Sequence, residues 1–314
     1  MQTRTYLVTG GCGFIGSHLV EALLAAGHQV RVLDDLSTGR RENIPAAAEL
    51  HLGDVADPAL VVRAMAGADG CFHLAAIASV ERGNQDWLGT HRANLTGSIA
   101  VFDAARRANN PAGPIPVVYA SSAAIYGDNP ALPLAEDAAP RPLSAYGADK
   151  LGSEQHGFVA AHVHGVPTTG LRFFNVYGPR QDPRSPYSGV ISIFCDRLRA
   201  GQPVTIFGDG GQSRDFVFVA DVVRALLAAM ERSAAGGAAA ARVFNVCTGR
   251  ATTIRDLAAT IAGILGRDPG IAFAPPRAGE IRASLGDPAR AASGLGVTAS
   301  TPLRDGLART LADG

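Results

Sequence analysis

A glycine-rich turn at residues 10–16, with the sequence GGCGFIG, constrains the fold more than any other feature of the chain. An apolar run at 5–9 precedes it and predicts a buried strand, and a helical pattern follows at 14–26. Glycines suit a sharp turn between a strand and a closely packed helix. The N-terminus of such a helix presents unpaired N–H groups, which favour an anion. The context predicts a dinucleotide-binding unit, although the spacing differs from the common G-x-G-x-x-G.

Short apolar runs alternate with helical patterns through the first half of the chain. Further strands are predicted at 29–33, 71–74, 116–119 and 168–173, with a helix over 90–108. This alternation indicates β-α-β units, and right-handed crossovers between them give a doubly wound parallel Rossmann sheet.

Beyond residue 174 the elements become shorter and Pro- and Gly-rich loops more frequent. We therefore expect an α/β fold in which a smaller α/β substrate-binding domain accompanies the sheet. The dinucleotide-binding domain is predicted to comprise residues 1–174 plus about 215–240. The substrate domain is predicted to comprise 175–214 plus about 241–314, with the later boundary drawn at an Ala- and Gly-rich stretch.

Composition excludes several classes of partner. Lys+Arg and Asp+Glu each number 28, so there is no basic excess for nucleic acid. No apolar run reaches the roughly 18 residues of a membrane span, and the first residues do not resemble a signal peptide. The four cysteines are scattered without a C-x-x-C, and His162 and His164 do not share a helix face. We expect reduced thiols, no metal site and a cytoplasmic location.

Acidic residues follow the predicted strand at 29–33 and a further short strand that ends before residue 53. Asp34 can accept both hydrogen bonds of an adenosine ribose diol and would repel a 2′-phosphate, which favours NAD over NADP. Arg40 and Arg41 lie nearby and would favour NADP, but the acid is better placed. Asp54 can bond the adenine amino group or serve as a turn residue, and the sequence leaves both open.

A Tyr-x-x-x-Lys pair, Tyr146 and Lys150, provides the candidate catalytic groups. Residues i and i+4 share one face of a helix, so the lysine charge is expected to lower the tyrosine pKa. Such a tyrosine can exchange a proton with a sugar hydroxyl near neutral pH. Ser122 ends a predicted parallel strand, where folds of this class place their chemistry.

With these motifs the whole chain resembles the extended short-chain dehydrogenase/reductase family, and within it the nucleotide-sugar 4-epimerases of the UDP-glucose 4-epimerase type. The resemblance also rests on the motifs at 73–76, 121–127, 172–180 and 214–217. Dehydrating members of the family carry Thr-Asp-Glu after the serine strand, whereas this chain has Ser122, Ala123 and Ala124. Without those extra acids, oxidation and reduction at one carbinol carbon is the simplest chemistry, which fits epimerisation.

The resemblance implies tightly held NAD. Tyr146 would take the proton of sugar O4 with help from Ser122, hydride would pass from C4 to NAD, and the 4-keto sugar would turn before hydride returns. Tyr146 and Lys150 are also implied to contact the cofactor. The other implied cofactor-binding residues are Gly10, Gly13, Phe14, Ile15, Gly16, Asp34, Asp35, Asp54, Val55, Leu74, Ala75, Ala76 and Asn94.

A UDP-sugar is the implied substrate. Arg214 and Arg277 would hold the diphosphate, since guanidinium offers fork geometry and a permanent charge. The other implied substrate-binding residues are Ser122, Ala123, Tyr146, Asn175, Val190, Phe207, Glu280 and Ser284. Ser284 stands where members confined to unsubstituted hexoses carry tyrosine, and Ala78 stands where some carry lysine. Together with Gln181, these residues predict room for a C2 N-acetyl group.

Two further expectations concern assembly and reaction. The helices around 90–108 and 146–164 carry apolar residues on more than one face, and the family resemblance implies that they form a homodimer interface. Epimerisation of a uronic acid, a pentose or a dTDP-linked sugar stays open as an alternative. A non-catalytic NAD-binding regulator is a third interpretation, against which the intact Ser122, Tyr146 and Lys150 set argues.

Overall fold

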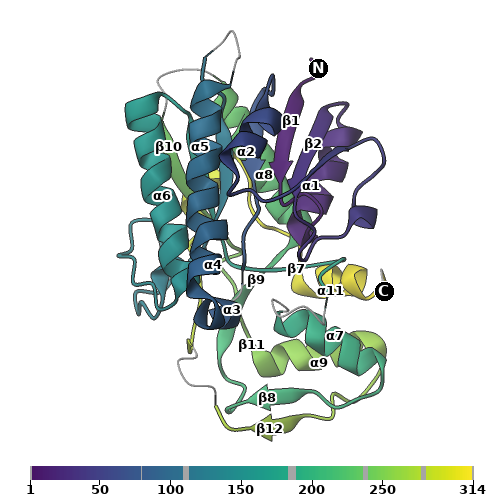
Figure 1. Ribbon diagram of the computed structural model, residues 1–314. Helices are drawn as coiled ribbons and strands as arrows, with labels where there is room; N and C mark the ends of the chain where they lie inside the picture. Colours follow the sequence, from purple (N-terminus) through teal and green to yellow (C-terminus); the bar gives the residue numbers. More distant parts are fainter. Residues whose placement is uncertain are drawn as a thin grey trace.

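A seven-stranded sheet forms the centre of the protein (Figure 1). The computed structural model of the chain describes residues 2–78, 80–108, 113–182, 189–235, 240–276 and 281–312. The strand order is β10-β6-β5-β4-β1-β2-β3, and all neighbours are parallel. This arrangement, with its reversal between β1 and β4, confirms the predicted doubly wound fold. The strands are β1 (Thr5–Thr9), β2 (Gln29–Asp34), β3 (Glu49–Leu52), β4 (Gly70–His73), β5 (Val117–Ser122), β6 (Thr168–Phe173) and β10 (Ala241–Val246).

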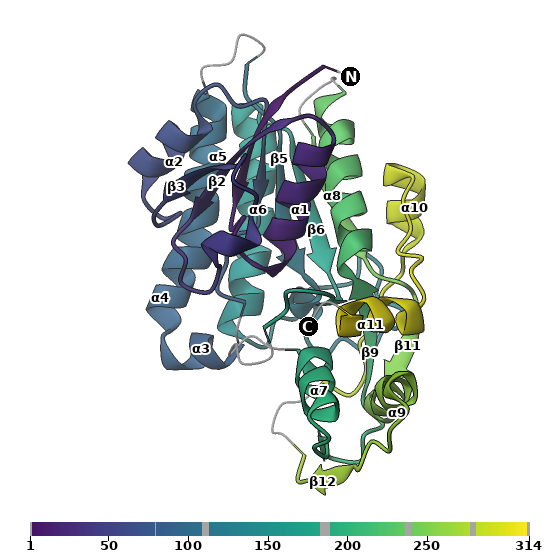
Figure 2. The same ribbon diagram turned by 90° about the vertical axis from the view of Figure 1, so that its right-hand side faces the viewer.

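Helices cover both faces of the sheet, as Figures 1 and 2 show. Successive residues of β1 serve opposite faces: Leu7 lies in a core shared with α2, α5 and α6, and Val8 in a core shared with α1 and α8. Both faces are buried, which explains the continuous apolar run in the sequence. The helices are α1 (Phe14–Ala25), α2 (Pro58–Met65), α5 (Gly97–Arg107), α6 (Ala145–His164) and α8 (Val219–Ala234).

The predicted helix over 90–108 is part of a longer helical segment. It comprises α4 (Trp87–His91), a π-helical turn (Arg92–Thr96) and α5, and α3 (Val80–Gln85) precedes it. Among the helices of the described ranges, none combines the length and apolar character that a bilayer-spanning segment needs.

A smaller α/β part lies beyond the carboxyl ends of the main strands (Figure 2). Its own core is built mainly by residues of α7, α9 and β9. A three-stranded sheet has the order β11-β9-β7, and β12 pairs with β8. The elements are β7 (Asn175–Tyr177), α7 (Val190–Arg199), β8 (Thr205–Phe207), β9 (Ser213–Phe218), β11 (Ala251–Thr253), α9 (Ile254–Leu265), β12 (Ala272–Ala274) and α11 (Leu303–Ala312). The helix α10 (Ala289–Leu295) instead packs against α8 and β10, and its Ala291 belongs to the core of the main sheet (Figure 2).

The topology moves two of the expected domain boundaries. β10 follows the boundary predicted near residue 240, yet it pairs with β6 as an edge strand of the main sheet. Residues 215–218, expected in the dinucleotide-binding domain, instead belong to β9 in the smaller sheet. The Ala- and Gly-rich stretch therefore connects α8 to β10 of the main sheet and does not separate two domains. The rest of the predicted division remains a prediction.

Candidate active site

The glycine turn joins β1 to α1 beside the end of β4. Gly10 has φ +69°, and a Cβ there would lie 2.7 Å from the backbone N of Ala75. A Cβ on Gly16 would overlap the carbonyl oxygen of Gly10, so the helix can approach the strand only with glycine at this position. Gly13 precedes the first helical residues, Phe14 and Ile15. This cradle lies at the reversal of strand order, where doubly wound sheets bind nucleotides, and it fits a dinucleotide.

Asp34 ties the turn to the loop that follows β2. Its carboxylate is buried and accepts the backbone N–H groups of Cys12 and Leu36, each at 2.9 Å. Burial raises the pKa of Asp34, and the two hydrogen bonds oppose that rise. Each carboxylate oxygen retains a lone pair for a ribose hydroxyl. Asp35 lies outside this contact and accepts the N–H and hydroxyl of Ser37.

The other expected cofactor residues surround the end of β4. The buried Asn94 side chain bonds both backbone groups of Ile77, with its oxygen 2.7 Å from the Ile77 N, and so fixes the segment that contains Leu74, Ala75 and Ala76. Val55 is buried in the core beneath α5. Asp54 caps the Ala56 N–H and forms a 3.0 Å ion pair with Arg92, which supports the turn interpretation of this residue.

The three candidate catalytic groups meet where β5 ends. Ser144 caps α6 by accepting the Gly147 N–H at 3.1 Å, and the first two turns of the helix then place Tyr146 and Lys150 on one face. The Tyr146 phenol and the Ser122 hydroxyl are hydrogen-bonded to each other. Lys150 Nζ donates to the carbonyl oxygen of Ala120 at 2.8 Å and lies 5.8 Å from the centroid of the Tyr146 ring. The structure thus brings the expected set together.

The expected lowering of the Tyr146 pKa is wrong for this structure. Burial raises the pKa of the phenol, and the hydrogen bond to Ser122 opposes the rise only in part. Burial also lowers the pKa of Lys150 to about 8, against the charge of Asp149. Desolvation is therefore the largest influence on the pKa of both groups.

The expected substrate residues belong to the smaller part and to segments around it. The backbone N of Ser284 donates to the Ser213 carbonyl at 3.1 Å, which puts Ser284 beside Arg214. Asp215, fully buried, accepts the backbone N–H groups of Thr248 and Gly249 and so fixes the strand that carries Arg214. Asn175 begins β7 with its side chain exposed, Val190 begins α7, Phe207 ends β8, and Ala123 begins a short 3₁₀ helix (Ala123–Tyr126). Arg277 and Glu280 lie outside the described residues.

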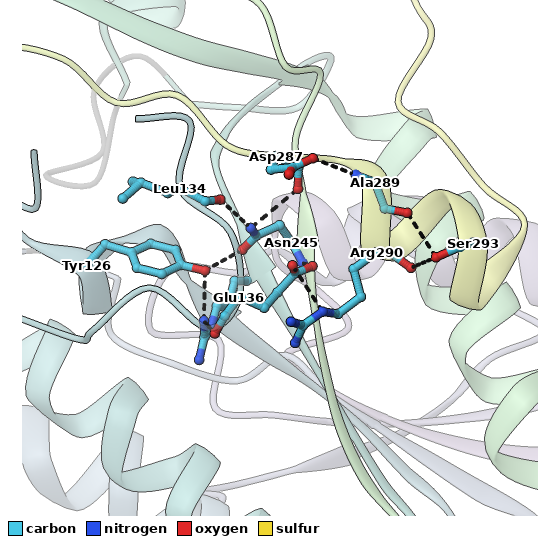
Figure 3. A network of polar contacts seen from close by, with 9 residues as sticks. Tyr126, Leu134, Glu136, Asn245, Asp287, Ala289, Arg290 and Ser293 are labelled. Atoms are coloured by element: carbon cyan, nitrogen blue, oxygen red, sulfur yellow. Dashed lines mark hydrogen bonds and ion pairs between the residues drawn. The ribbon is translucent and has the colours of Figure 1, made fainter. Parts of the chain in front are cut away.

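A buried polar network behind Ser122 was missed in the sequence. Glu154 on α6 pairs with Arg172 on β6, and Arg172 also donates to the Tyr126 hydroxyl at 2.7 Å. Figure 3 shows the continuation from Tyr126 through Asn245 to Glu136. No spacing rule links residues on different strands and loops, so the sequence carried no signal for these contacts. Within the described part of the chain, His, Cys, Asp and Glu form no group suited to a metal ion.

Residues 6–247 match the sequence model of the NAD dependent epimerase/dehydratase family. The chain belongs to this family. It is therefore an NAD-dependent enzyme of the epimerase type, and the glycine cradle and Asp34 fit that cofactor. The UDP-glucose 4-epimerase of Mycolicibacterium smegmatis is 40% identical to this enzyme over 312 residues, which cover 97% of this chain and 96% of that protein.

Two solved structures show how closely the enzyme follows its family in three dimensions. A UDP-glucose 4-epimerase of Thermotoga maritima with UDP-glucose has a TM-score of 0.92, 37% identity and 98% coverage of both chains. A UDP-N-acetylglucosamine 4-epimerase of Methanobrevibacter ruminantium, in complex with UDP-N-acetylmuramic acid, has a TM-score of 0.91 and 33% identity, and covers 100% of this chain and 98% of that chain.

One sequence signal marks the site of this enzyme independently of any motif. Of the 28 lysine and arginine residues, Lys150 alone is lysine. Lysine and arginine are interchangeable at most exposed positions, but a buried amine can change its pKa and fit a small space in ways that guanidinium cannot. The structure buries this lone lysine beside Tyr146 and Ser122, where a compact amine is placed in the core.

Proposed function

We propose that the enzyme is a nucleotide-sugar 4-epimerase that interconverts UDP-glucose and UDP-galactose, and also UDP-GlcNAc and UDP-GalNAc. The observation that carries this proposal is the meeting of Ser122, Tyr146 and Lys150 at the end of β5. These groups lie on the same edge of the sheet as the glycine turn, since β4 alone separates β5 from β1. The UDP-sugar epimerases among its relatives support the same reaction class.

The chain's own residues would move one proton. NAD, when bound, supplies the acceptance and return of hydride at the sugar C4. The turn at Gly10, Gly13 and Gly16 would hold its pyrophosphate, and Asp34 its adenosine ribose. Tyr146 would hold the O4 proton while C4 is a ketone and give it back afterwards. Ser122, which hydrogen-bonds the phenol, would stabilise its charged form.

Lys150 and the arginines would orient the reactants. The Lys150 ammonium faces the strand end, where it would bond the nicotinamide ribose and keep a positive charge near the phenol. Arg214, together with Arg277, would hold the UDP diphosphate. Asn175 would add a hydrogen bond near the diphosphate, and Val190 and Phe207 would flank the uracil. Holding the sugar at its nucleotide would let the 4-keto group turn between two faces without leaving.

We propose that an N-acetylated sugar is accepted because Ser284 and Ala78 are small. Ser284 lies next to the strand that carries Arg214. One structural neighbour acts on UDP-N-acetylglucosamine and another is bound to UDP-glucose, which supports both sugars. Uronic acid, pentose and dTDP-linked sugars are the alternative substrates of the same chemistry.

We also propose a homodimer formed through α5 and α6, which lie side by side (Figure 1). Their outer surfaces expose Ile99, Phe158, Val159 and Val163, and Phe158 is 59% exposed. An apolar surface of this kind is typical of a protein–protein contact. Light scattering after gel filtration should give a dimer mass, and Phe158→Glu should yield monomers. The four cysteines are buried and free, which supports a cytoplasmic location.

The proposed reaction is tested by incubating the purified protein with UDP-glucose and, separately, with UDP-GlcNAc, without added NAD. Chromatography then resolves each C4 epimer. Conversion supports both the reaction and a retained cofactor, and the ratio of the two rates reports the space at C2. If neither sugar is converted even after NAD is added, the reaction on these substrates is excluded. Uronic acid, pentose and dTDP-linked sugars are then tested, and inertness toward all of them would favour a regulator.

A further inference from the structure

A buried ion pair lies next to the proposed catalytic groups. The side chains of Glu154 and Arg172 are only 6% and 8% exposed. They form a two-pronged contact, with Arg172 Nε 2.8 Å from Glu154 Oε1 and Arg172 Nη2 2.7 Å from Glu154 Oε2. Removing two charges from water costs about as much as their attraction returns, so such a pair contributes little net stability. The pair therefore matters more for the geometry that it imposes than for the stability that it adds.

Glu154 continues the helix face that carries the catalytic groups. Tyr146, Lys150 and Glu154 are spaced four residues apart on α6 and share one face. Each bonds a different residue at the end of β5: Tyr146 bonds Ser122, Lys150 bonds Ala120, and Glu154 accepts the Ser121 hydroxyl. Three positions on one helix face thereby contact three consecutive residues of the strand.

Arg172 connects this contact between α6 and β5 to the rest of the fold. It pairs with Ser121 in the β5–β6 register, and its Nη1 donates to the Glu136 carbonyl at 2.8 Å and to the Tyr126 hydroxyl. Tyr126 donates to Asn245 on β10 at 2.7 Å, as Figure 3 shows. None of these side chains is among the buried polar atoms without a partner in the described residues. A network with all partners present holds its members in one arrangement.

We propose that Glu154 and Arg172 are positioning residues, which fix the rotation and axial position of α6 against β5. Through this contact the Tyr146 phenol stays at Ser122 and the Lys150 ammonium stays at the end of the strand. The inference rests on the proposed roles of Tyr146 and Lys150. Glu154 and Arg172 act only through those residues. A displacement of about 1 Å in a reacting group can cost about 100-fold in rate, which sets the expected effect.

The test compares Glu154→Gln with the apolar double variant Glu154→Leu/Arg172→Met. Glu154→Gln leaves Arg172 charged and buried, so it lowers both Tm and kcat. The double variant removes both charges, which is often neutral or stabilising for a buried pair. Its Tm is expected to recover, while kcat stays about 100-fold below the wild type and KM changes less than about threefold. Asp103→Asn, which breaks an exposed pair with Arg106, is the matched control and keeps kcat.

Because Lys150 is the one lysine of the chain, protein labelled with [13Cε]lysine gives a single side-chain resonance for it. In the folded double variant this resonance is expected to move away from its wild-type position. A double variant with wild-type Tm, kcat and lysine resonance would overturn the proposal. If the double variant does not fold, Glu154→Asp decides: a kcat reduced about tenfold at unchanged KM is expected, and an unchanged kcat overturns the proposal.

The same assays separate this inference from the proposed function. Tyr146→Phe is measured alongside. If Tyr146→Phe keeps full activity, the assignment of the catalytic groups has failed. If Tyr146→Phe is inactive and the Glu154 variants match the wild type, the assignment stands and only the positioning role is lost.

Discussion

Lys150 Nζ donates a 2.8 Å hydrogen bond to the carbonyl oxygen of Ala120, two residues before Ser122 on β5. The lysine side chain is nearly inaccessible to water, and its pKa falls to about 8 because burial disfavours the charged form. The enzyme therefore keeps a charge in its core at neutral pH. The burial of this charge should therefore lower the free energy of unfolding by a measurable amount.

Lys150→Met is expected to stabilise the protein at pH 7 and to abolish catalysis. Below pH 8 the lysine is charged in both the folded and the unfolded chain, so the cost of its burial is fully present. Between about 8 and 10.5 the unfolded chain binds the extra proton, so wild-type stability rises with pH. The variant gains at most about 3 kcal/mol in unfolding free energy at pH 7, and this gain shrinks toward pH 10.5. Urea unfolding at several pH values measures it.

The control for this experiment is Arg63→Met, which removes an exposed cation from α2. Its effect on the unfolding free energy should be small and nearly independent of pH. A Lys150→Met protein that is less stable than the wild type at pH 7 would contradict the assigned cost of burial.

Tyr146→Phe removes the proposed proton-transfer group and leaves the ring in place. A positioned acid–base group contributes about 10²- to 10⁴-fold, so kcat should fall within that range while bound NAD is retained. Tyr6→Phe, in the core of the main sheet, provides a tyrosine control that keeps its activity. Turnover and the NAD content of the purified proteins are measured together. Full turnover by Tyr146→Phe would remove Tyr146 from the mechanism.

Asp34→Asn should weaken NAD binding and reduce the preference for NAD over NADP. The amide oxygen can still accept one backbone N–H, so the turn is disturbed less than by alanine. A hydrogen bond to a charged group is worth about 1.5–3 kcal/mol, which corresponds to a loss of roughly tenfold or more in NAD affinity. Titration calorimetry with each dinucleotide measures both constants, and Glu42→Gln is the control. An unchanged ratio of the two affinities would refute the role of Asp34.

Ser284→Tyr should narrow the range of UDP-sugars that the enzyme converts. A tyrosine beside the strand that carries Arg214 would occupy the space assigned to the N-acetyl group. Overfilling a packed site costs about 1–3 kcal/mol, so turnover of UDP-GlcNAc should fall about fivefold or more while UDP-glucose is still converted. Ser293→Tyr on the exposed surface of α10 is the control. Undiminished turnover of UDP-GlcNAc by Ser284→Tyr would remove this residue from the sugar pocket.

The sequence predicted the local parts of this molecule well. The glycine turn, the strand that ends at Asp34 and the helix that carries Tyr146 and Lys150 all depend on neighbours within a few residues. Three other features depend on contacts between distant segments. They are the hydrogen bond from the Cys12 N–H to Asp34, the Glu154–Arg172 pair, and the pairing of β10 with β6. The sign of the Tyr146 pKa shift was predicted wrongly, because spacing shows which charges are near but does not show how much water is excluded.

The fate of a deuterium placed at C4 of UDP-glucose tests the proposed mechanism most directly. The enzyme is incubated with this substrate in ordinary water, and the UDP-galactose formed is analysed by mass spectrometry and NMR. If Tyr146 moves only the O4 proton while hydride leaves and returns within one complex, the deuterium stays at C4 of the product. Replacement of the label by solvent hydrogen would contradict the account, because it would require a carbon-bound proton to exchange with water.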